Sequence, residues 1–281
     1  MLIQSGAAFE TRLPVPPGGA FLSRRQQVAD RRRTERELRR AVDAREFVLH
    51  YEGRHDLSSG ALTAVEGHIA WMHRRRGLIA SSTLREFAGE AGLIAPLCGW
   101  MLGEACAAAA IWPGDAIMVS VGVSARQVAG GMLPEQVADA LERSGLHPER
   151  LELRLTEAAL TGCGVETLLM LSAIRDLGIG LALDDFGAGL ASLSLLKRLP
   201  LTAIKLDCSL VRNLPKDREN ASIVRAAVGM GHALGSAVVA DGIETEQQRA
   251  FLLSAGCEEG QGPLFGPVMP SDQLRALLRR L

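Results

Sequence analysis

A chain of 281 residues, with 47% hydrophobic but only 4% aromatic residues, is long enough for one large core and suits aliphatic strands packed against helices. The formal net charge of −1 excludes a global field that would attract nucleic acid or a membrane surface. No apolar run approaches the roughly 18 residues of a spanning helix, and the first residues lack the apolar segment of a signal peptide.

The five cysteines are widely spaced and show no zinc-ligand pattern or paired framework. We therefore expect buried thiols in a reducing compartment. Together with the absence of a targeting segment, this predicts a cytoplasmic protein.

The N-terminal region changes character twice along the chain. Residues 1–20 are rich in proline and glycine without a hydrophobic period, which predicts a flexible tail. From Arg24 to Arg45 there are nine arginines against four acids, with sparse apolar positions at Val28, Leu38, Ala41 and Val42. This pattern predicts a charged helix with a narrow buried stripe, whose basic face is either solvated or in contact with an acidic partner. We divide the chain into a tail (1–20), a basic helical lead-in (21–33) and one main domain (34–281).

Within the main domain, short apolar runs alternate with segments of helical period. The predicted strands are Phe47–Tyr51, Thr63–Ala70, Ile117–Val121, Leu151–Leu155, Gly180–Leu183, Ala203–Leu206, Ala237–Ala240 and Glu259–Gly260. The predicted helices include Pro96–Trp112, Pro134–Ser144, Val165–Leu177, Arg218–Leu234 and Thr245–Ala255. About eight alternations with fully apolar strands predict a parallel sheet covered by helices. A closed (β/α)8 barrel is the leading fold, and an open doubly wound sheet is the alternative.

In α/β barrels the working groups lie at the carboxyl ends of the strands. The residues at those ends are Glu66, Gly122, Arg154, Asp184, Asp185, Lys205, Asp241 and Gln261. Converging carboxylates repel one another unless a cation lies between them, which predicts an Mg²⁺ or Mn²⁺ site. The pair Asp184–Asp185 taken alone fits a solvated loop equally well, but Lys205 lies within an apolar strand and requires a carboxylate partner or a wet cavity.

From about Thr34 to the C-terminus, more than two hundred residues, the chain resembles the EAL domain family, and five segments in register carry most of the resemblance. They are LALDDFGAGLASLSLLKRLPLTAIKLD from Leu181, VSVGVSARQ from Val119, LELRLTE from Leu151, VVADGIETEQQ from Val238 and GCEEGQGPLF from Gly256. The resemblance implies a (β/α)8 TIM-type barrel whose active members hold two Mg²⁺ or Mn²⁺ ions and hydrolyse cyclic di-GMP to linear pGpG.

The resemblance also assigns roles to positions of this chain. It implies metal ligands at Glu66, Asp184, Asp185 and Asp241, a lysine beside the attacking water at Lys205, and a carboxylate bracing loop six at Glu157. Positions on the substrate side are Glu52, Ala70, Asp207, Glu244 and Gln261.

Several of these positions depart from the family pattern. Gly122 and Arg154 replace a ligating asparagine and glutamate, and Asp241 is one methylene shorter than the family's glutamate. Because glycine supplies no oxygen and a guanidinium repels cations, one metal position is expected to be lost. We hypothesise that Arg154 takes the place of the cation by pairing with Glu66 and Asp184.

Substrate contacts are replaced as well. Glu52, Ala70 and Pro263 stand where the family has glutamine, arginine and tyrosine. Glu52 adds a negative charge where a dianionic ligand would bind.

These departures leave two functions to compare. The first is a degenerate, catalytically inactive EAL domain in cyclic di-GMP signalling, with no cofactor, weak affinity for cyclic di-GMP and a protein partner that the sequence does not identify. The alternative is an active, Mg²⁺- or Mn²⁺-dependent cyclic di-GMP phosphodiesterase. The oligomeric state stays open between a monomer and a homodimer, because the segment of loop six is altered.

Overall fold

The computed structural model describes residues 36–280 apart from gaps at 39, 42–43, 45, 75, 80–83, 85–87, 89–92, 115 and 190–192. The predicted tail (1–20), the lead-in (21–33) and the boundary at residue 34 lie outside the described residues. Where the charged segment is described, Leu38 and Ala41 are fully buried within helical backbone. Both belong to the predicted apolar stripe, which is therefore confirmed at these two positions.

The strands form one closed barrel. In chain order they are β1 (Phe47–Asp56), β2 (Leu62–His73), β4 (Met118–Gly122), β5 (Leu151–Thr156), β6 (Gly180–Phe186), β7 (Ala203–Leu206), β8 (Ala237–Ala240) and β9 (Glu259–Gln261). The sheet runs β1-β9-β8-β7-β6-β5-β4-β2, and β2 pairs back with β1. Two short strands extend it, β3 (Gly77–Ile79) beside β2 and β10 (Met269–Pro270) beside β1. The closure confirms the TIM-type barrel and excludes the open doubly wound sheet.

Strand β1 differs from the predicted all-parallel arrangement. It runs antiparallel to both of its barrel neighbours, β2 and β9, whereas the other neighbouring pairs from β2 to β9 are parallel. The reason is the short connection from Leu57 to Ala61, which is a turn closed by an Asp56 N–H to Ala61 C=O hydrogen bond of 2.9 Å. A parallel crossover needs a dozen or more residues, so a connection this short forces a hairpin.

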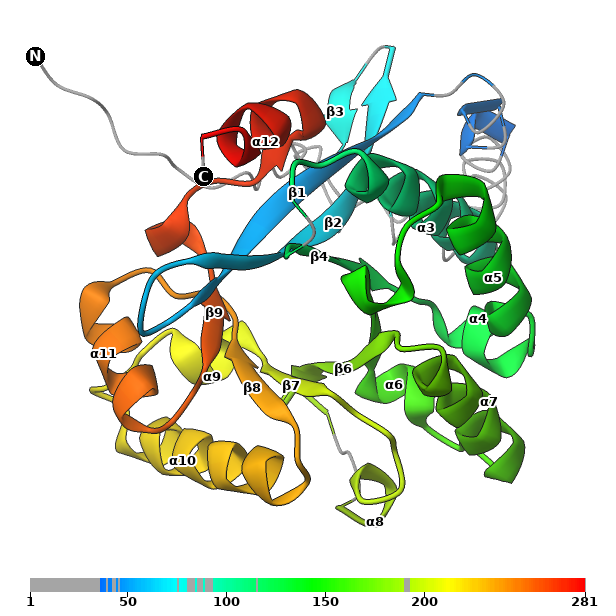
Figure 1. The fold of residues 1–281 in the computed structure, drawn as a ribbon. Coiled ribbons are helices and arrows are strands. Elements are labelled where there is room, and N and C mark those ends of the chain that lie inside the picture. The colour runs from blue at the N-terminus through cyan, green and yellow to red at the C-terminus, as the bar shows by residue number, and fades with distance from the viewer. Residues whose placement is uncertain are drawn as a thin grey trace, which may run out of the picture.

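Helices surround the strands (Figure 1). They are α3 (Ile94–Ala110), α4 (Ala125–Ala129), α5 (Leu133–Ser144), α6 (Glu157–Leu160), α7 (Val165–Asp176), α8 (Leu193–Leu196), α9 (Cys208–Val211), α10 (Arg218–Ala233), α11 (Glu246–Ser254) and α12 (Ser271–Leu278), with short 3-10 turns at Pro148–Arg150 and Pro263–Phe265. Each of the five predicted helices begins and ends within two residues of the observed helix, which is α3, α5, α7, α10 or α11. Such agreement reflects local signals, for example the Thr245–Gln248 capping box that starts α11.

The apolar core lies between the strands and the helices. One cluster joins β1 to β6 with α3, α5, α7 and α12, and a second lies around β7 to β9 with α10 and α11. Among the described residues, no helix combines the length and apolarity that a bilayer crossing requires.

The cysteines only partly match the expectation of buried thiols. Cys106 and Cys257 are buried, but Cys98, Cys163 and Cys208 are half-buried, and none of the five forms a disulfide. The expectation is wrong for those three, which lie on or beside helices at the outer layer rather than on barrel strands.

Candidate functional site

The carboxyl ends of the strands bring five predicted residues into one buried cluster, which we call the rim cluster. It consists of Glu66 on β2, Arg154 on β5, Asp184 on β6, Lys205 on β7 and Asp241 directly after β8. Strand β7 lies opposite β2 in the barrel, and β5 is separated from β2 by β4, so the contacts of Glu66 with Lys205 and Arg154 reach through the barrel interior. The prediction that these strand ends converge is confirmed.

Glu66 lies at the centre of the rim cluster, and both of its carboxylate oxygens are occupied by protein donors. Oε2 accepts hydrogen bonds from Lys205 Nζ at 2.6 Å and from Gln261 Nε2 at 3.0 Å. Oε1 lies 2.6 Å from Arg154 Nη1. Three of the roughly four acceptor sites of this carboxylate are therefore used, which leaves little capacity for another ligand.

Arg154 bridges two carboxylates. Its Nη1 lies 2.6 Å from Glu66 Oε1 and donates to Asp184 Oδ2 at 2.5 Å. This is the pairing that we hypothesised from the sequence, and the side chain is only 9% exposed. A positive group thus occupies the space between two of the predicted metal ligands.

Lys205 has the carboxylate partners that its position within an apolar strand required. Besides Glu66, Nζ lies 3.0 Å from Asp241 Oδ2 and 3.5 Å from Asp184 Oδ1. The rim cluster therefore sets two fixed positive charges against three carboxylates.

Proton affinities follow from these contacts. Burial alone would lower the pKa of the Lys205 ammonium, but Glu66, Asp241 and Asp184 hold that pKa above its ordinary value. Burial would raise the pKa of Glu66, but Arg154 and Lys205 hold it well below its ordinary value. Asp241 differs, because burial together with the charge of Glu66 raises its pKa although Lys205 opposes that shift. The cluster is therefore ionised around Glu66 and short of positive charge near Asp241.

Other predicted residues lie outside the rim cluster. Asp185 is exposed and has a left-handed backbone with φ 57°, and its backbone N–H donates to Asp184 Oδ1 at 3.1 Å. Glu157 Oε1 accepts the Gly187 N–H at 3.3 Å and so contacts the segment that follows β6. Asp207 caps α9 by accepting the Ser209 N–H at 2.9 Å.

The substrate-side positions are divided between the rim and the core. Glu244 is exposed, whereas Ala70 is buried at 5% exposure with no polar group to offer. At the rim, Gln261 Nε2 lies 3.4 Å from Glu52 Oε2. His68 Nε2 also lies 3.4 Å from Glu52 Oε2, so an imidazole stands at this edge of the cluster.

A second buried ionic group was missed from the sequence. Arg54 Nη1 donates to Glu152 Oε1 at 2.8 Å, Arg54 Nε lies 3.0 Å from Glu259 Oε2, and Ser120 donates to Glu152 Oε1 at 2.6 Å. We call these four residues the lower layer, because Glu152 precedes Arg154 by two positions on β5. A signal was present: Glu152 is a charge within an apolar run, the same feature that singled out Lys205.

The residues of the rim cluster do not fit a divalent cation. Arg154 fills the space between Glu66 and Asp184, and within the described ranges no group of three or more His, Cys, Asp or Glu side chains is arranged to hold a metal ion. Mg²⁺ requires oxygen ligands near 2.1 Å in an octahedral arrangement. A guanidinium supplies none of these.

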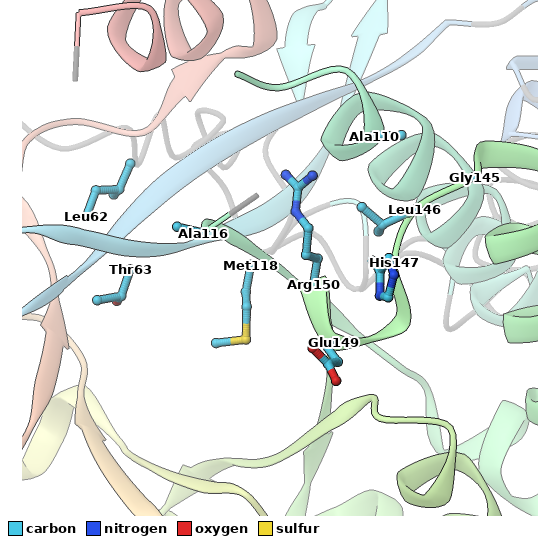
Figure 2. A pocket seen from close by; sticks show the side chains of 10 residues that line it. All are labelled: Leu62, Thr63, Ala110, Ala116, Met118, Gly145, Leu146, His147, Glu149 and Arg150. Carbon is cyan, nitrogen blue, oxygen red and sulfur yellow. The ribbon is translucent and has the colours of Figure 1, made fainter. Parts of the chain in front are cut away.

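A cavity of about 790 Å³ lies at the opposite end of the barrel (Figure 2). It is lined by Leu62 and Met118, which begin β2 and β4, and by Glu149 and Arg150, which precede β5. Arg150 Nη2 donates to the Ala109 carbonyl at 3.0 Å, near the end of α3. None of the predicted metal or substrate positions lines this cavity, so it is separate from the rim cluster.

Comparisons with known proteins identify the family of this chain. Residues 35–268 match the model of the EAL domain. The bifunctional diguanylate cyclase/cyclic di-GMP phosphodiesterase MucR of Pseudomonas aeruginosa is 37% identical over 85% of this chain and 36% of its own length. The cyclic di-GMP phosphodiesterase PdeR of Escherichia coli is 34% identical over 83% of this chain and 36% of its own length. The chain thus spans about a third of these relatives.

Solved structures show the same barrel. The PaMucR phosphodiesterase in complex with cyclic di-GMP has a TM-score of 0.82 and 36% identity, covering 86% of this chain and 99% of that one. The FimX EAL domain of Pseudomonas aeruginosa, at 22% identity and a TM-score of 0.76, shares the fold over 84% of this chain and 96% of its own. With its barrel, its strand-end motifs and a family match over most of its length, this chain belongs to the EAL domain family.

Proposed function

We propose that this chain is a catalytically inactive EAL domain that acts in cyclic di-GMP signalling through binding. The observation that carries the proposal is Arg154 lying between Glu66 and Asp184, with both oxygens of Glu66 already engaged. Two-metal phosphoryl hydrolysis depends on cations that activate water and neutralise the phosphoryl oxygens. Arg154 and Lys205 carry positive charge but neither coordinates a water as a Lewis acid.

The charges at the rim affect how strongly an anionic ligand can bind there. Asp241 and Glu52 add negative charge beyond what Arg154 and Lys205 balance, and the proximity of Glu52 contributes to the raised pKa of Asp241. A dianionic dinucleotide meets repulsion there, so we propose weak affinity for cyclic di-GMP, no resident cofactor and a protein partner as the main target. We further propose a cytoplasmic location, from the unpaired cysteines.

The decisive test is a product assay. The full chain is incubated with Mn²⁺ and cyclic di-GMP, and pGpG is followed by chromatography. The proposal expects no pGpG above the rate in protein-free buffer. Formation of pGpG that disappears in the Asp184→Ala variant would overturn it, because that variant controls for a contaminating activity.

The alternative, an active cyclic di-GMP phosphodiesterase, has its own support. Glu66, Asp184, Asp185, Lys205 and Asp241 are all retained, and relatives such as PdeR are named as cyclic di-GMP phosphodiesterases. Activity in this chain would require Arg154 to leave the cluster when substrate binds. A structure with substrate and Mn²⁺ would show Arg154 turned to solvent in that case.

A further inference from the structure

Gly122 and Arg154 lie directly beside each other at the rim. They are register partners on the parallel strands β4 and β5. A Cβ atom at position 122 would stand 3.6 Å from Arg154 Nη2, with no other atom outside its own chain neighbours within 4 Å. One methyl group therefore fits at ordinary contact distance, but a longer side chain competes for volume with the guanidinium.

The guanidinium in turn depends on that volume. It is planar, and its Nη1 reaches Glu66 and Asp184 at the same time. A shift of about 1 Å away from both carboxylates would lengthen both contacts beyond the range of a charge-assisted hydrogen bond. The absence of a side chain at position 122 and the presence of Arg154 are thus linked by packing.

The environment beneath Arg154 supports its position. Glu152, two residues earlier on β5, is held by Arg54 at 2.8 Å and by Ser120 at 2.6 Å. Its negative charge acts favourably on Arg154. The guanidinium therefore lies between carboxylates above and below, in an interior where an unpaired charge is strongly unfavourable.

We propose that Gly122 and Arg154 form one structural unit that replaces a divalent cation, so that the carboxylates of the rim cluster are neutralised by the chain itself. This deepens the proposed function and rests on it for its biological meaning, but its physical content is separate. The barrel then has no requirement for a divalent cation, and whatever binds at the rim meets the same charge whether or not a cation is present.

The experiment compares five full-length chains: wild type, G122A, G122N, R154E and the double variant G122N/R154E. Each is melted in EDTA and in Mn²⁺, and each is titrated with Mn²⁺ by calorimetry. Asn and Glu are chosen because their side chains supply oxygen ligands. G122A is the matched control, since it adds only the methyl group that fits.

For wild type and G122A, we expect nearly equal melting temperatures, no effect of Mn²⁺ and no stoichiometric binding heat. G122N melts lower than G122A without gaining Mn²⁺ binding, because it displaces Arg154. R154E melts lower in EDTA by roughly 6 to 20 °C, since three carboxylates lose a cation and gain a neighbour of like charge.

The double variant decides the coupling. When residue 154 is Glu, the G122N substitution is expected not to lower the melting temperature further. The double variant is also expected to bind Mn²⁺ and to melt at a higher temperature in Mn²⁺ than in EDTA. If R154E does not fold in EDTA, R154Q replaces it in the same comparison, because glutamine removes the positive charge without adding a negative one. The coupling would be overturned if G122N lowered the melting temperature by the same amount in the chain with Arg154 as in the chain with Glu or Gln at that position.

The proposal also fails if wild type takes up one Mn²⁺ per chain at this site. These outcomes are distinguishable from failure of the proposed function. Wild type that makes pGpG refutes inactivity, whereas additive effects of G122N and R154E refute only the coupled unit.

Discussion

Lys205 shows how one buried charge organises its surroundings. Its side chain is 5% exposed, and the ammonium nitrogen lies within 3.5 Å of carboxylate oxygens from Glu66, Asp184 and Asp241. Removing it leaves these carboxylates in the barrel interior with Arg154 as the remaining cation. The buried cluster would then be short of positive charge by two units.

We therefore expect Lys205→Met to lower the free energy of unfolding by about 3–5 kcal/mol, the range for breaking a buried ion pair. Urea unfolding at pH 7 measures the change. The matched control is Lys216→Met at an exposed position, with an effect within about 0.5 kcal/mol. A loss below about 1 kcal/mol for Lys205→Met would show that water reaches the cluster.

Glu46 offers a test of pH dependence away from the rim. Its carboxylate accepts the Trp71 indole N–H at 3.1 Å and lies 2.8 Å from Arg74 Nε. The indole hydrogen bond, and then the nearby arginines, outweigh burial and hold the pKa of Glu46 below its ordinary value of 4.5.

A lowered pKa in the fold means that the stabilisation by Glu46 is present above pH 4.5 and is lost as the pH falls through the folded-state pKa. Glu46→Gln should therefore be less stable than wild type at pH 7, and this difference should shrink below pH 4.5 as wild-type Glu46 takes up its proton. Thermal melts from pH 7 to pH 3 follow the difference. A gap that widens on acidification would contradict the assigned contacts.

At the scale of elements, helix α10 contains two glycines with opposite environments. A Cβ atom at Gly231 would meet Val238 Cγ2 at 2.5 Å, so this glycine allows β8 to approach the helix. A Cβ atom at Gly229 would meet nothing within 4 Å. The two positions lie two residues apart in one helix, so intrinsic helix propensity affects them alike.

Gly229→Ala should raise the free energy of unfolding by roughly 0.5–1 kcal/mol, because alanine is the better helix former. Gly231→Ala should instead lower it by about 1–3 kcal/mol, because the methyl group overpacks the contact with β8. Chemical denaturation of both variants measures the signs. If both substitutions changed the free energy of unfolding in the same direction, helix propensity rather than packing would determine the effect at both positions.

At the scale of the whole molecule, the fixed positive charges predict how the barrel responds to cations. Arg154 and Lys205 belong to the chain, so the charge at the rim does not change when divalent cations are removed. Any affinity for cyclic di-GMP should therefore be the same in EDTA and in Ca²⁺.

Calorimetry of the full chain with cyclic di-GMP in both buffers measures this. The G122N/R154E variant is the contrasting case, and its affinity should rise in Ca²⁺. An affinity of the wild type that increases tenfold or more in Ca²⁺ would mean that a cation displaces Arg154 from the cluster.

Several features of this protein follow from the sequence alone. Apolar runs predicted the strands, and helical periods with capping residues predicted α5, α7, α10 and α11. The motifs indicated a barrel of the EAL type. Charges at the strand ends identified Glu66, Asp184, Lys205 and Asp241 as neighbours. These signals are local, or they depend only on the rule that the carboxyl ends of barrel strands share one face.

Tertiary structure alone decided the rest. The antiparallel course of β1 depends on a turn too short for a crossover. In the lower layer, Arg54 on β1 meets Glu152 on β5, two strands that β2 and β4 separate in the barrel. The room that Gly122 leaves for the guanidinium of Arg154 is a matter of a few ångströms between neighbouring strands. Such distances arise only when the sheet closes, because residues far apart in the chain then meet in one interior where each charge must find its partner.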